Sequence, residues 1–391
     1  MDNKKLKEER IRLFRDSASF RPVSRIPHFA NAVTWKVFDA GHTLDEALVD
    51  LAVMKECVVH FLDNYTVDGL MDTGIRNQFT VTEAFGAKGY YYYYDSESIG
   101  IKDHMLCTVD TLFDYLRDYD RFVWEQVLPE KYGDEWYDRD ISVWKKTFGE
   151  YLKYTMFIIS MASLTSKKYG IPSLAPNNPM TGTINFAAEE LMANLLGIKE
   201  LSTAMRRNAS LLKDFVDEWD EKKIDPQIEK VLGSDGPNMK YCFDASVLML
   251  VHNIMNTSQF ETFYWPHLEK LLRAYEKKGM NARIFAEGSI LRFADYFRDF
   301  SRGTLTMHIE NDGVFDIRRS MPNVAIMGGL TTEILRAEHI SDAVEATRML
   351  CDSFGREGGF ILSEGRMLSY RNDAYSENYR AICDFMNEGG R

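Results

Sequence analysis

The last third of the chain alternates between amphipathic stretches and short apolar runs. In PHLEKLLRAYEKKG, the residues Leu268, Leu271, Leu272 and Tyr275 recur at i, i+3, i+4 and i+7, which is the spacing of one helix face. The stretches RFADYFRDF, VFDIRRSMP, SDAVEATRMLCDSFG and SENYRAICDFMNEGG follow the same rule, as does Leu201–Trp219 upstream. The pattern therefore predicts a series of helices, with Ser341 as the N-cap of the one that starts SDAV.

Between these helices lie apolar runs that are too short for helices and typical of buried strands. They read ARIFAEG, LTMHIEND, VAIMGG and GGFILS, and RIPHFA, TVDGLMD and TGTINF are further candidates upstream. Strands that alternate with helices indicate βαβ units and a parallel sheet. Because no GxGxxG turn is present, we expect this α/β chain to close its sheet as a (β/α)8 TIM barrel rather than to open it as a Rossmann sheet.

No Gly, Ser or Pro-rich linker divides the chain, so residues 1–391 are predicted to form a single barrel domain. The region Tyr90–Lys168 is less regular and is interpreted as an insertion that carries helices in the N-terminal half. Its run of five tyrosines favours a strand or hairpin. These rings could be half-buried at a sheet edge or could form an aromatic wall over a ligand.

Charge and cysteine usage narrow the class of protein. With 47 Lys and Arg against 59 Asp and Glu, the net charge of −12 disfavours a nucleic-acid partner. Five scattered cysteines without a CxxC pair suit reduced thiols, and neither a signal peptide nor an apolar run of membrane-spanning length stands out. We therefore expect a cytoplasmic protein without a membrane partner.

Active sites of such barrels lie at the carboxyl ends of the strands. The polar residues that end each apolar run are therefore the candidates for the site. The candidates are His28, Asn31, Asp68, Asp72, Asn185, Glu287, His308, Glu310, Ser363 and Glu364.

Glu287, His308 and Glu310 form the strongest subset. His308 and Glu310 alternate along one strand and so share a face, while Glu287 ends the preceding strand. Two carboxylates and an imidazole could bind Zn²⁺, or could work without metal as a general acid and base. The alternative is that these side chains only bond loop backbone and cap the helices that follow.

Three blocks together resemble the uroporphyrinogen decarboxylase superfamily: FYWPHLEKLLRAYEKKGMNARIFAEGS, ENDGVFDIRRSMPNVAIMGGL and GGFILSEGRMLS with SENYRAICDFM. RPVSRIPHF looks like the superfamily's opening strand. Membership implies a (β/α)8 barrel, and the superfamily contains both decarboxylases and methyltransferases that exchange methyl groups with corrinoid proteins.

Two branches of that superfamily fit the sequence poorly. The decarboxylase signature Met-Arg-Gln-Ala-Gly-Arg is replaced by HFANAVTWK, which lacks the arginines for a polycarboxylate tetrapyrrole. Thiol-directed methyltransferases carry a zinc-binding His-x-Cys where this chain has Phe285 and Glu287, and ILSEG supplies no cysteine.

The branch that demethylates substrates of corrinoid O-demethylases is more similar. Its pattern Glu-x14-Glu-x20-His matches Glu287 and His308, although Leu272 stands at the first position, where Glu310 or Glu364 would have to substitute. The resemblance implies a methyltransferase that takes a methyl group from a methoxylated, aromatic small molecule and passes it to cobalamin on a separate corrinoid protein. Glu287, His308 and Glu310 would be its catalytic and metal-binding residues, with or without Zn²⁺.

Candidate substrate-binding residues complete the prediction: Asn31, Trp35, Asp68, Asn185, Tyr264 and Glu364. The alternatives are a methylcobalamin-dependent transferase to another small acceptor and a decarboxylase-like barrel that binds a tetrapyrrole. The oligomeric state stays open, with a homodimer as one possibility.

Overall fold

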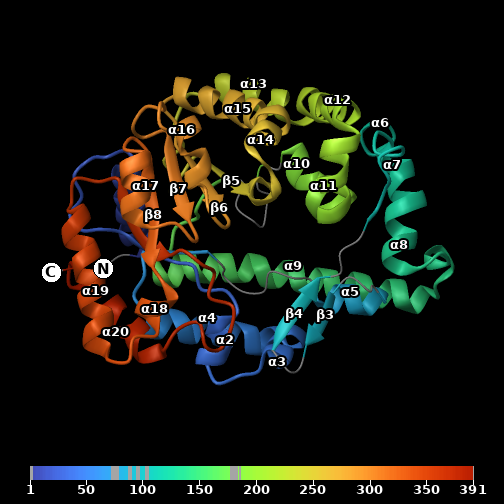
Figure 1. Cartoon of the computed structure of the whole chain (residues 1–391). Coiled ribbons are helices and arrows are strands. Elements are labelled where there is room, and N and C mark those ends of the chain that lie inside the picture. Colours follow the sequence, from blue (N-terminus) through green and yellow to red (C-terminus); the bar gives the residue numbers. More distant parts are fainter. Residues whose placement is uncertain are drawn as a thin grey trace.

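The computed structural model describes residues 3–71, 79–86, 90–93, 97–101, 105–176, 184 and 186–390. Its main feature is a curled sheet of seven parallel strands in the order β2-β1-β9-β8-β7-β6-β5 (Figure 1). The strands are β1 His28–Ala30, β2 Gly69–Leu70, β5 Ala245–Met249, β6 Ala282–Ala286, β7 Leu305–Ile309, β8 Ala325–Leu330 and β9 Phe360–Glu364. An α/β fold with a parallel sheet is thereby confirmed.

One isolated pair adjoins the sheet beside β5. Ile184 forms an isolated parallel bridge with Val247, on the side of β5 that faces away from β6. Ile184 belongs to the TGTINF run that the sequence predicts as a strand. The described residues thus form a TIM-like barrel of seven strands plus this bridge, and residues 177–183 and 185 lie outside the described part of the chain.

Helices surround the convex face of the sheet (Figure 1). Those outside the insertion are α1 Asn3–Ala18, α2 Trp35–Asp39, α3 Leu44–Val49, α4 Leu51–Asn64, α10 Ala187–Glu190, α11 Gly197–Arg207, α12 Ala209–Trp219, α13 Asp225–Leu232, α14 Thr257–Phe263, α15 Trp265–Lys277, α16 Ala294–Phe297, α17 Val314–Ser320, α18 Thr332–Leu335, α19 Ile340–Phe354 and α20 Ser376–Asn387. No helix among the described residues combines the length and the apolar character needed to cross a membrane.

The predicted insertion between residues 90 and 168 is largely helical and extends to one side of the sheet (Figure 1). Its tyrosine run begins an antiparallel hairpin, β3 Tyr90–Tyr93 with β4 Ser98–Ile101. The helices α6 Asp114–Arg117, α7 Tyr119–Phe122, α8 Leu128–Tyr132 and α9 Ile141–Tyr169 follow the hairpin, and α5 Phe79–Phe85 precedes the insertion.

Three details differ from the sequence prediction. Strand β5 was not predicted, although its residues ASVLM are β-prone and buried. The helix predicted for Leu201–Trp219 is two helices, since Asn208 leaves the helical region with φ −126° and ψ 33°. The N-cap of α19 is His339 rather than Ser341, which lies inside the helix.

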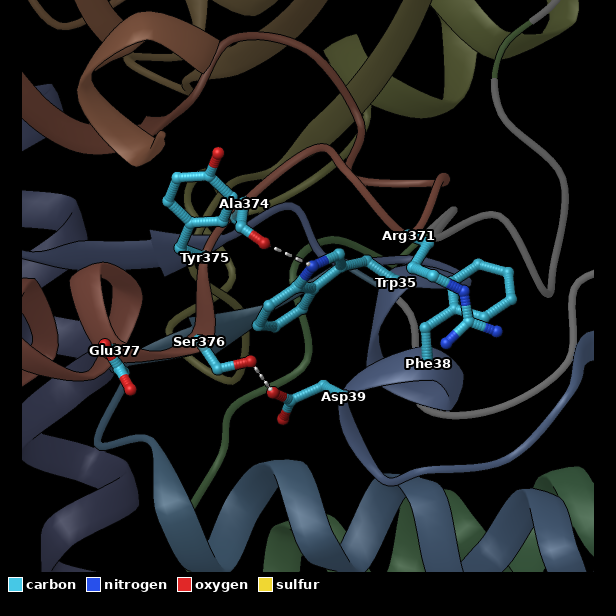
Figure 2. A pocket seen from close by; sticks show the side chains of 8 residues that line it. All are labelled: Trp35, Phe38, Asp39, Arg371, Ala374, Tyr375, Ser376 and Glu377. Atoms are coloured by element: carbon cyan, nitrogen blue, oxygen red, sulfur yellow. Dashed lines mark hydrogen bonds between the residues drawn. The ribbon is translucent and has the colours of Figure 1, made fainter. Parts of the chain in front are cut away.

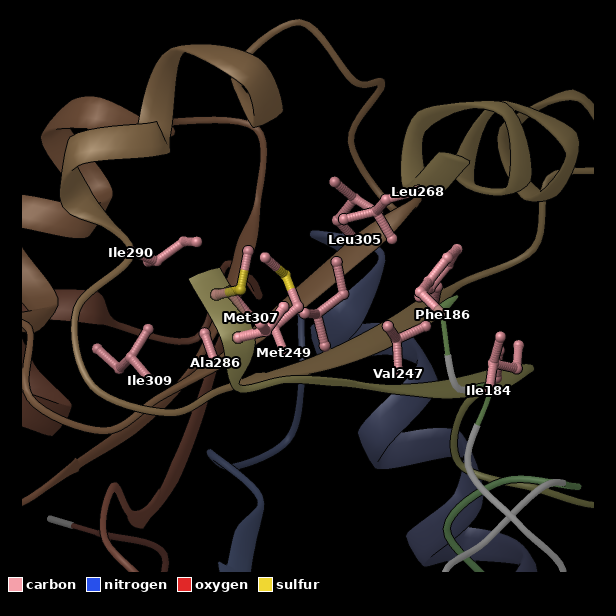
Figure 3. Packing of buried hydrophobic residues seen from close by; sticks show 14 of the residues in the cluster. Ile184, Phe186, Val247, Met249, Leu268, Ala286, Ile290, Leu305, Met307 and Ile309 are labelled. Atoms are coloured by element: carbon pink, nitrogen blue, oxygen red, sulfur yellow. The ribbon is translucent and has the colours of Figure 1, made fainter. Parts of the chain in front are cut away.

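Strand β6 shows how the sheet divides its side chains. All five residues of ARIFA are buried, because helices cover one face and the inside of the curl covers the other. Ile284 and Ala286 belong to the outer hydrophobic core, while Arg283 and Phe285 alternate to the inner face. Figure 3 shows this outer core, in which Met249 of β5 and Met307 of β7 lie close together with Ile290 and Ile309 nearby and Leu268 of α15 above.

Helix α1 covers the amino end of the barrel. Its Phe14 is fully buried and packs edge-on against Phe29 of β1 and against Phe243. A buried ion pair with 2.9 Å between Arg15 Nη2 and Asp244 Oδ1 fixes the helix in place. Side chains of α1 thus pack into the amino end of the curled sheet.

Candidate active site

Arg283 and His308 meet on the inner face of the sheet. They lie on the neighbouring strands β6 and β7, in which Phe285 is paired with His308. Arg283 Nη2 donates to His308 Nδ1 at 2.5 Å, and His308 Nε2–H donates to the carbonyl oxygen of Glu364 at 2.9 Å. Desolvation and the adjacent guanidinium lower the pKa of His308 well below its ordinary value. The imidazole is therefore neutral, with its proton on Nε2.

Arg283 is buried on the inner face of the sheet. Its side chain is 1% exposed, and its other bond runs from Nη1 to Ser246 Oγ at 3.1 Å. Burial lowers the pKa of the guanidinium to about 9, and no carboxylate of the described residues forms an ion pair with it. Nε has no hydrogen-bond partner.

A small cavity of about 30 Å³ lies against this guanidinium, which is room for one or two water molecules. Asn31, predicted as a substrate contact, lines it, and its buried Oδ1 has no partner. The lining consists of Asn31, Met71, Ser246, Val247, Leu248, Arg283, Phe285 and Met367.

Glu287 and Glu310 lie at the rim, one step beyond the ends of β6 and β7. Glu287 is exposed, and Glu310 is half-buried with Oε2 accepting the Gly288 N–H at 2.6 Å. Partial desolvation and the nearby Glu310 carboxylate raise the pKa of Glu287. The structure thus brings these two predicted carboxylates together at the rim.

Gly288 explains why a buried strand ends on Glu-Gly. Its φ of +73° lies in the left-handed region, and a Cβ there would collide with the side chain of Asn253. The chain can therefore turn sharply after Glu287, and this carboxylate stays at the rim.

A second acid at the carboxyl end was missed from the sequence. Glu189 of α10 is 3% exposed and accepts hydrogen bonds from Leu250 N at 2.9 Å and from the Tyr264 hydroxyl at 2.9 Å. Burial is the main cause that raises the pKa of Glu189 to about 7, and Glu287 adds to it. Tyr264, predicted as a substrate contact, is fully buried and positions this acid instead. Two glutamates in the first turn of a helix are common, because their charge interacts favourably with the helix dipole. The sequence AAEE therefore carries no signal that sets Glu189 apart.

The predicted zinc set of Glu287, His308 and Glu310 does not converge. Both ring nitrogens of His308 are engaged, one by Arg283 and the other by a carbonyl oxygen, so no lone pair is left for a metal ion. Across the described ranges, no group of three His, Cys, Asp or Glu side chains is arranged to hold a metal ion. The residues present do not fit Zn²⁺ in this geometry.

The other predicted carboxylates that the structure describes do not line the cavity. Asp68 precedes β2 at the amino end, where Arg25 and Arg10 pair with it and the His28 N–H donates to it at 2.9 Å. Asp68 thus anchors α1 rather than facing the mouth. Asn185 and Asp72 lie outside the described residues.

Glu364 points away from the inner face, toward the covering helices. It is fully buried, and its Oε2 accepts the Asn31 N–H at 2.5 Å. Only its carbonyl oxygen reaches the site, through His308. Glu364 therefore positions the β1 end and the imidazole.

Trp35 lies at a separate surface pocket of about 430 Å³ between α2 and the segment that leads into α20 (Figure 2). Its indole N–H donates to the Ala374 carbonyl at 3.1 Å, and its ring packs against Tyr65 and Tyr379. Figure 2 also shows Ser376 bonded to Asp39 beside it. The structure does not bring Trp35 together with Glu287 and Arg283.

The fold is similar to that of a methyltransferase from Methanosarcina mazei. The TM-score is 0.57 at 12% sequence identity, over 96% of this chain and 97% of that chain. At this identity the likeness shows a shared fold. No protein-family model matches the sequence, and no curated protein matches it.

Proposed function

We propose that the protein is a corrinoid-dependent methyltransferase that demethylates a methoxylated aromatic small molecule. The methyl group passes to the cob(I)alamin of a separate corrinoid protein, which is the co-substrate and supplies the nucleophile. The observation that carries the proposal is the group of acids at the carboxyl end of the strands. Glu287 and Glu310 lie at the rim, and Glu189 is buried against Leu250 and Tyr264, with burial as the main cause that raises the pKa of Glu287 and Glu189.

Ether cleavage needs a proton donor at this place. When the methyl carbon–oxygen bond breaks, its electron pair stays on the oxygen, and an alkoxide or phenolate is a poor leaving group. A carboxylic acid that donates its proton to this oxygen lowers the barrier, and a donor is most effective when its pKa is raised toward the working pH. Glu287 donates in this proposal, since partial desolvation and the Glu310 carboxylate raise its pKa, and Glu189 is the buried acid that can resupply the proton. No metal takes part in these steps.

Two further observations support this reading. The chain shares its fold, over nearly its whole length, with a protein named a methyltransferase. Its sequence also resembles the demethylating branch at Glu287 and His308, and lacks the zinc-binding thiolates of the thiol-directed branch. In this chain His308 accepts a hydrogen bond from Arg283, and the proposed proton donors are carboxylic acids.

The test is a transfer assay with free cob(I)alamin, kept reduced by a titanium(III) chelate, and a panel of methoxylated aromatics. We expect the absorbance of cob(I)alamin to give way to that of methylcob(III)alamin, with one equivalent of free phenol by chromatography. If neither product forms with any member of the panel, also after addition of a small corrinoid protein, the proposal is wrong. Methyl transfer from methylcobalamin to an added acceptor without ether cleavage would instead support the reverse reaction.

A further inference from the structure

Helix α9 runs from the sheet out into the insertion (Figure 1) and carries an apolar stripe on its solvent side. Seven large side chains form the stripe, each between 38% and 67% exposed: Ile141, Trp144, Phe148, Tyr151, Leu152, Met156 and Ile159. They recur every three or four residues and so share one side of the helix, while Tyr154, Phe157 and Met161 are buried on the other. Because the outer face of a surface helix is normally polar, an apolar stripe of this length indicates a partner.

The apolar surface continues beyond the amino end of α9. Trp136 is buried there and contacts Trp144, with 6.3 Å between the ring centroids. It also contacts Trp124 and Tyr137, which are both exposed. The insertion thus presents an apolar surface that extends from α9 to the segment before it.

We infer that a second copy of the protein binds this stripe, with the two α9 helices antiparallel about a two-fold axis at position 150. No residue of the stripe takes part in the proposed reaction, so the dimer does not rest on that proposal.

The spacing of the stripe is the same when it is read from either end. In an antiparallel pair with its two-fold axis at position 150, each residue faces the one that lies equally far from 150 in the other direction. The facing pairs are Ile141 with Ile159, Trp144 with Met156, and Phe148 with Leu152, each partner coming from the other copy. Apolar side chains therefore meet apolar side chains along the stripe, as a self-complementary interface requires.

Gly149 gives a separate reason to expect a second helix at this place. Glycine inside a helix is less favourable than alanine. A Cβ at position 149 would have no neighbouring atom within 4 Å among the described residues, so packing within the chain does not require the glycine. With the same two-fold axis, Gly149 faces Tyr151 of the second copy, and the missing side chain leaves room for that ring.

The charges of α9 also permit this pairing. Lys145 and Lys153 flank the stripe and face Thr155 and Thr147 of the second copy, so these lysines do not oppose each other. Glu150 lies at the axis, but it is on the opposite side of the helix from Phe148 and bonds to Lys153 with 2.7 Å between Oε1 and Nζ.

The size of the stripe matches that of a protein interface. Seven large side chains that are about half exposed offer roughly 800 Å² of surface, close to the ~800 Å² that each partner of a standard interface buries. A membrane surface suits the stripe less well, because a protein with a net charge of −12 is repelled by anionic lipids.

Sedimentation equilibrium of the full chain over a range of micromolar concentrations tests the dimer. We expect twice the mass of the chain, with a dissociation constant in the micromolar range or below. Phe148→Glu with Leu152→Glu sets carboxylates opposite each other and should weaken the dimer ~100-fold or more. Phe148→Lys with Leu152→Glu sets a cation opposite a carboxylate and should restore most of the affinity. Met349→Glu replaces an equally exposed apolar residue of α19 and is the control that stays dimeric.

Disulfide formation tests the direction of the helices. The five native cysteines are buried, so introduced surface thiols can be followed on mild oxidation. A mixture of Ile141→Cys and Ile159→Cys should yield a crosslinked dimer, whereas neither variant should crosslink by itself. A crosslink within Ile141→Cys alone would show parallel helices and overturn the antiparallel pairing.

Other outcomes overturn the interface itself. They are a wild-type protein that is monomeric at every concentration, and a dimer whose affinity is unchanged in Phe148→Glu with Leu152→Glu. A monomer that floats with phosphatidylcholine vesicles, and no longer does so in this variant, assigns the stripe to a membrane surface instead. Circular dichroism verifies that each variant is folded. If the double glutamate variant is not folded, the crosslinking of the two cysteine variants decides, since its absence contradicts the interface.

Discussion

Arg283 donates a hydrogen bond to His308, with 2.5 Å between Nη2 and Nδ1, and this bond keeps a neutral imidazole buried beside a guanidinium. The arrangement makes the stability of the protein depend on pH. The native state resists protonation of His308, because burial and Arg283 lower its pKa, while the unfolded state takes up a proton near pH 6.5.

Acidification below pH 6.5 should therefore destabilise the native protein through His308. The unfolded chain then binds more protons than the native one, so the free energy of unfolding falls as the pH falls. In His308→Gln this contribution is absent, and the urea-derived free energy should change less between pH 7 and pH 5. His339→Gln, at the N-cap of α19, serves as control. Equal pH slopes for wild type and His308→Gln would contradict the assignment of a neutral, buried imidazole.

Glu189 should make the free energy of unfolding depend on pH in the opposite direction. Its pKa is raised to about 7, so the native state holds a proton that the unfolded state has released above pH ~4.5. The stabilising contribution is present below pH 4.5 and is lost as the pH rises through 7, with a limit on the order of 3 kcal/mol. Glu189→Gln should become more stable relative to wild type between pH 5 and pH 8, as measured by urea unfolding at each pH. A difference that does not vary with pH would show that Glu189 is ionised throughout.

Glu287→Gln should reduce demethylation by a factor of ~10²–10⁴, the usual contribution of a positioned proton donor. The wild-type rate should fall as the pH rises through the raised pKa of Glu287, and the variant should lose this dependence. The measurement is single-turnover formation of methylcob(III)alamin. Glu345→Gln, an exposed residue of α19, should retain the wild-type rate and pH profile. A Glu287→Gln variant with wild-type kinetics would remove this residue from the reaction.

Removal of metal should leave the protein unchanged. Because both nitrogens of His308 are engaged within the chain, dialysis against a chelator is expected to alter neither the melting temperature nor the rate of methyl transfer. Elemental analysis of the purified protein provides the stoichiometry. One equivalent of zinc that is lost in His308→Gln would restore the ligand set predicted from the sequence.

Asp68→Asn should affect stability rather than substrate binding. The carboxylate is 2% exposed and pairs with Arg10 and Arg25, so its neutralisation leaves buried charge uncompensated, at a cost of about 3–5 kcal/mol. Chemical denaturation measures this loss. The KM for the methoxylated substrate should stay within about twofold at a temperature where the variant is folded, and a large rise in KM would return Asp68 to the substrate site.

The sequence by itself determined the fold class and the end of the barrel at which to look. Apolar runs and helix periodicity are local properties, so β6 to β9 and the helices between them could be predicted, together with Glu287 and Glu310 as the residues that follow two of these strands. Strand β5 was not predicted, because ASVLM is short and the residues on either side of it give no clear signal for a strand.

Only the tertiary structure decided which polar groups meet. Arg283 sits within an apolar run, and its lack of a carboxylate partner among the described residues depends on every element that surrounds it. Glu364 ends β9 and Trp35 begins α2, yet both are buried under the outer helices. Glu364 alternates to the outer face of its strand together with Leu362, and Trp35 packs against Tyr65 and Tyr379. The proton affinity of Glu189 likewise arises from burial against a segment more than sixty residues away. Such environments are sums over distant contacts, which no local pattern encodes.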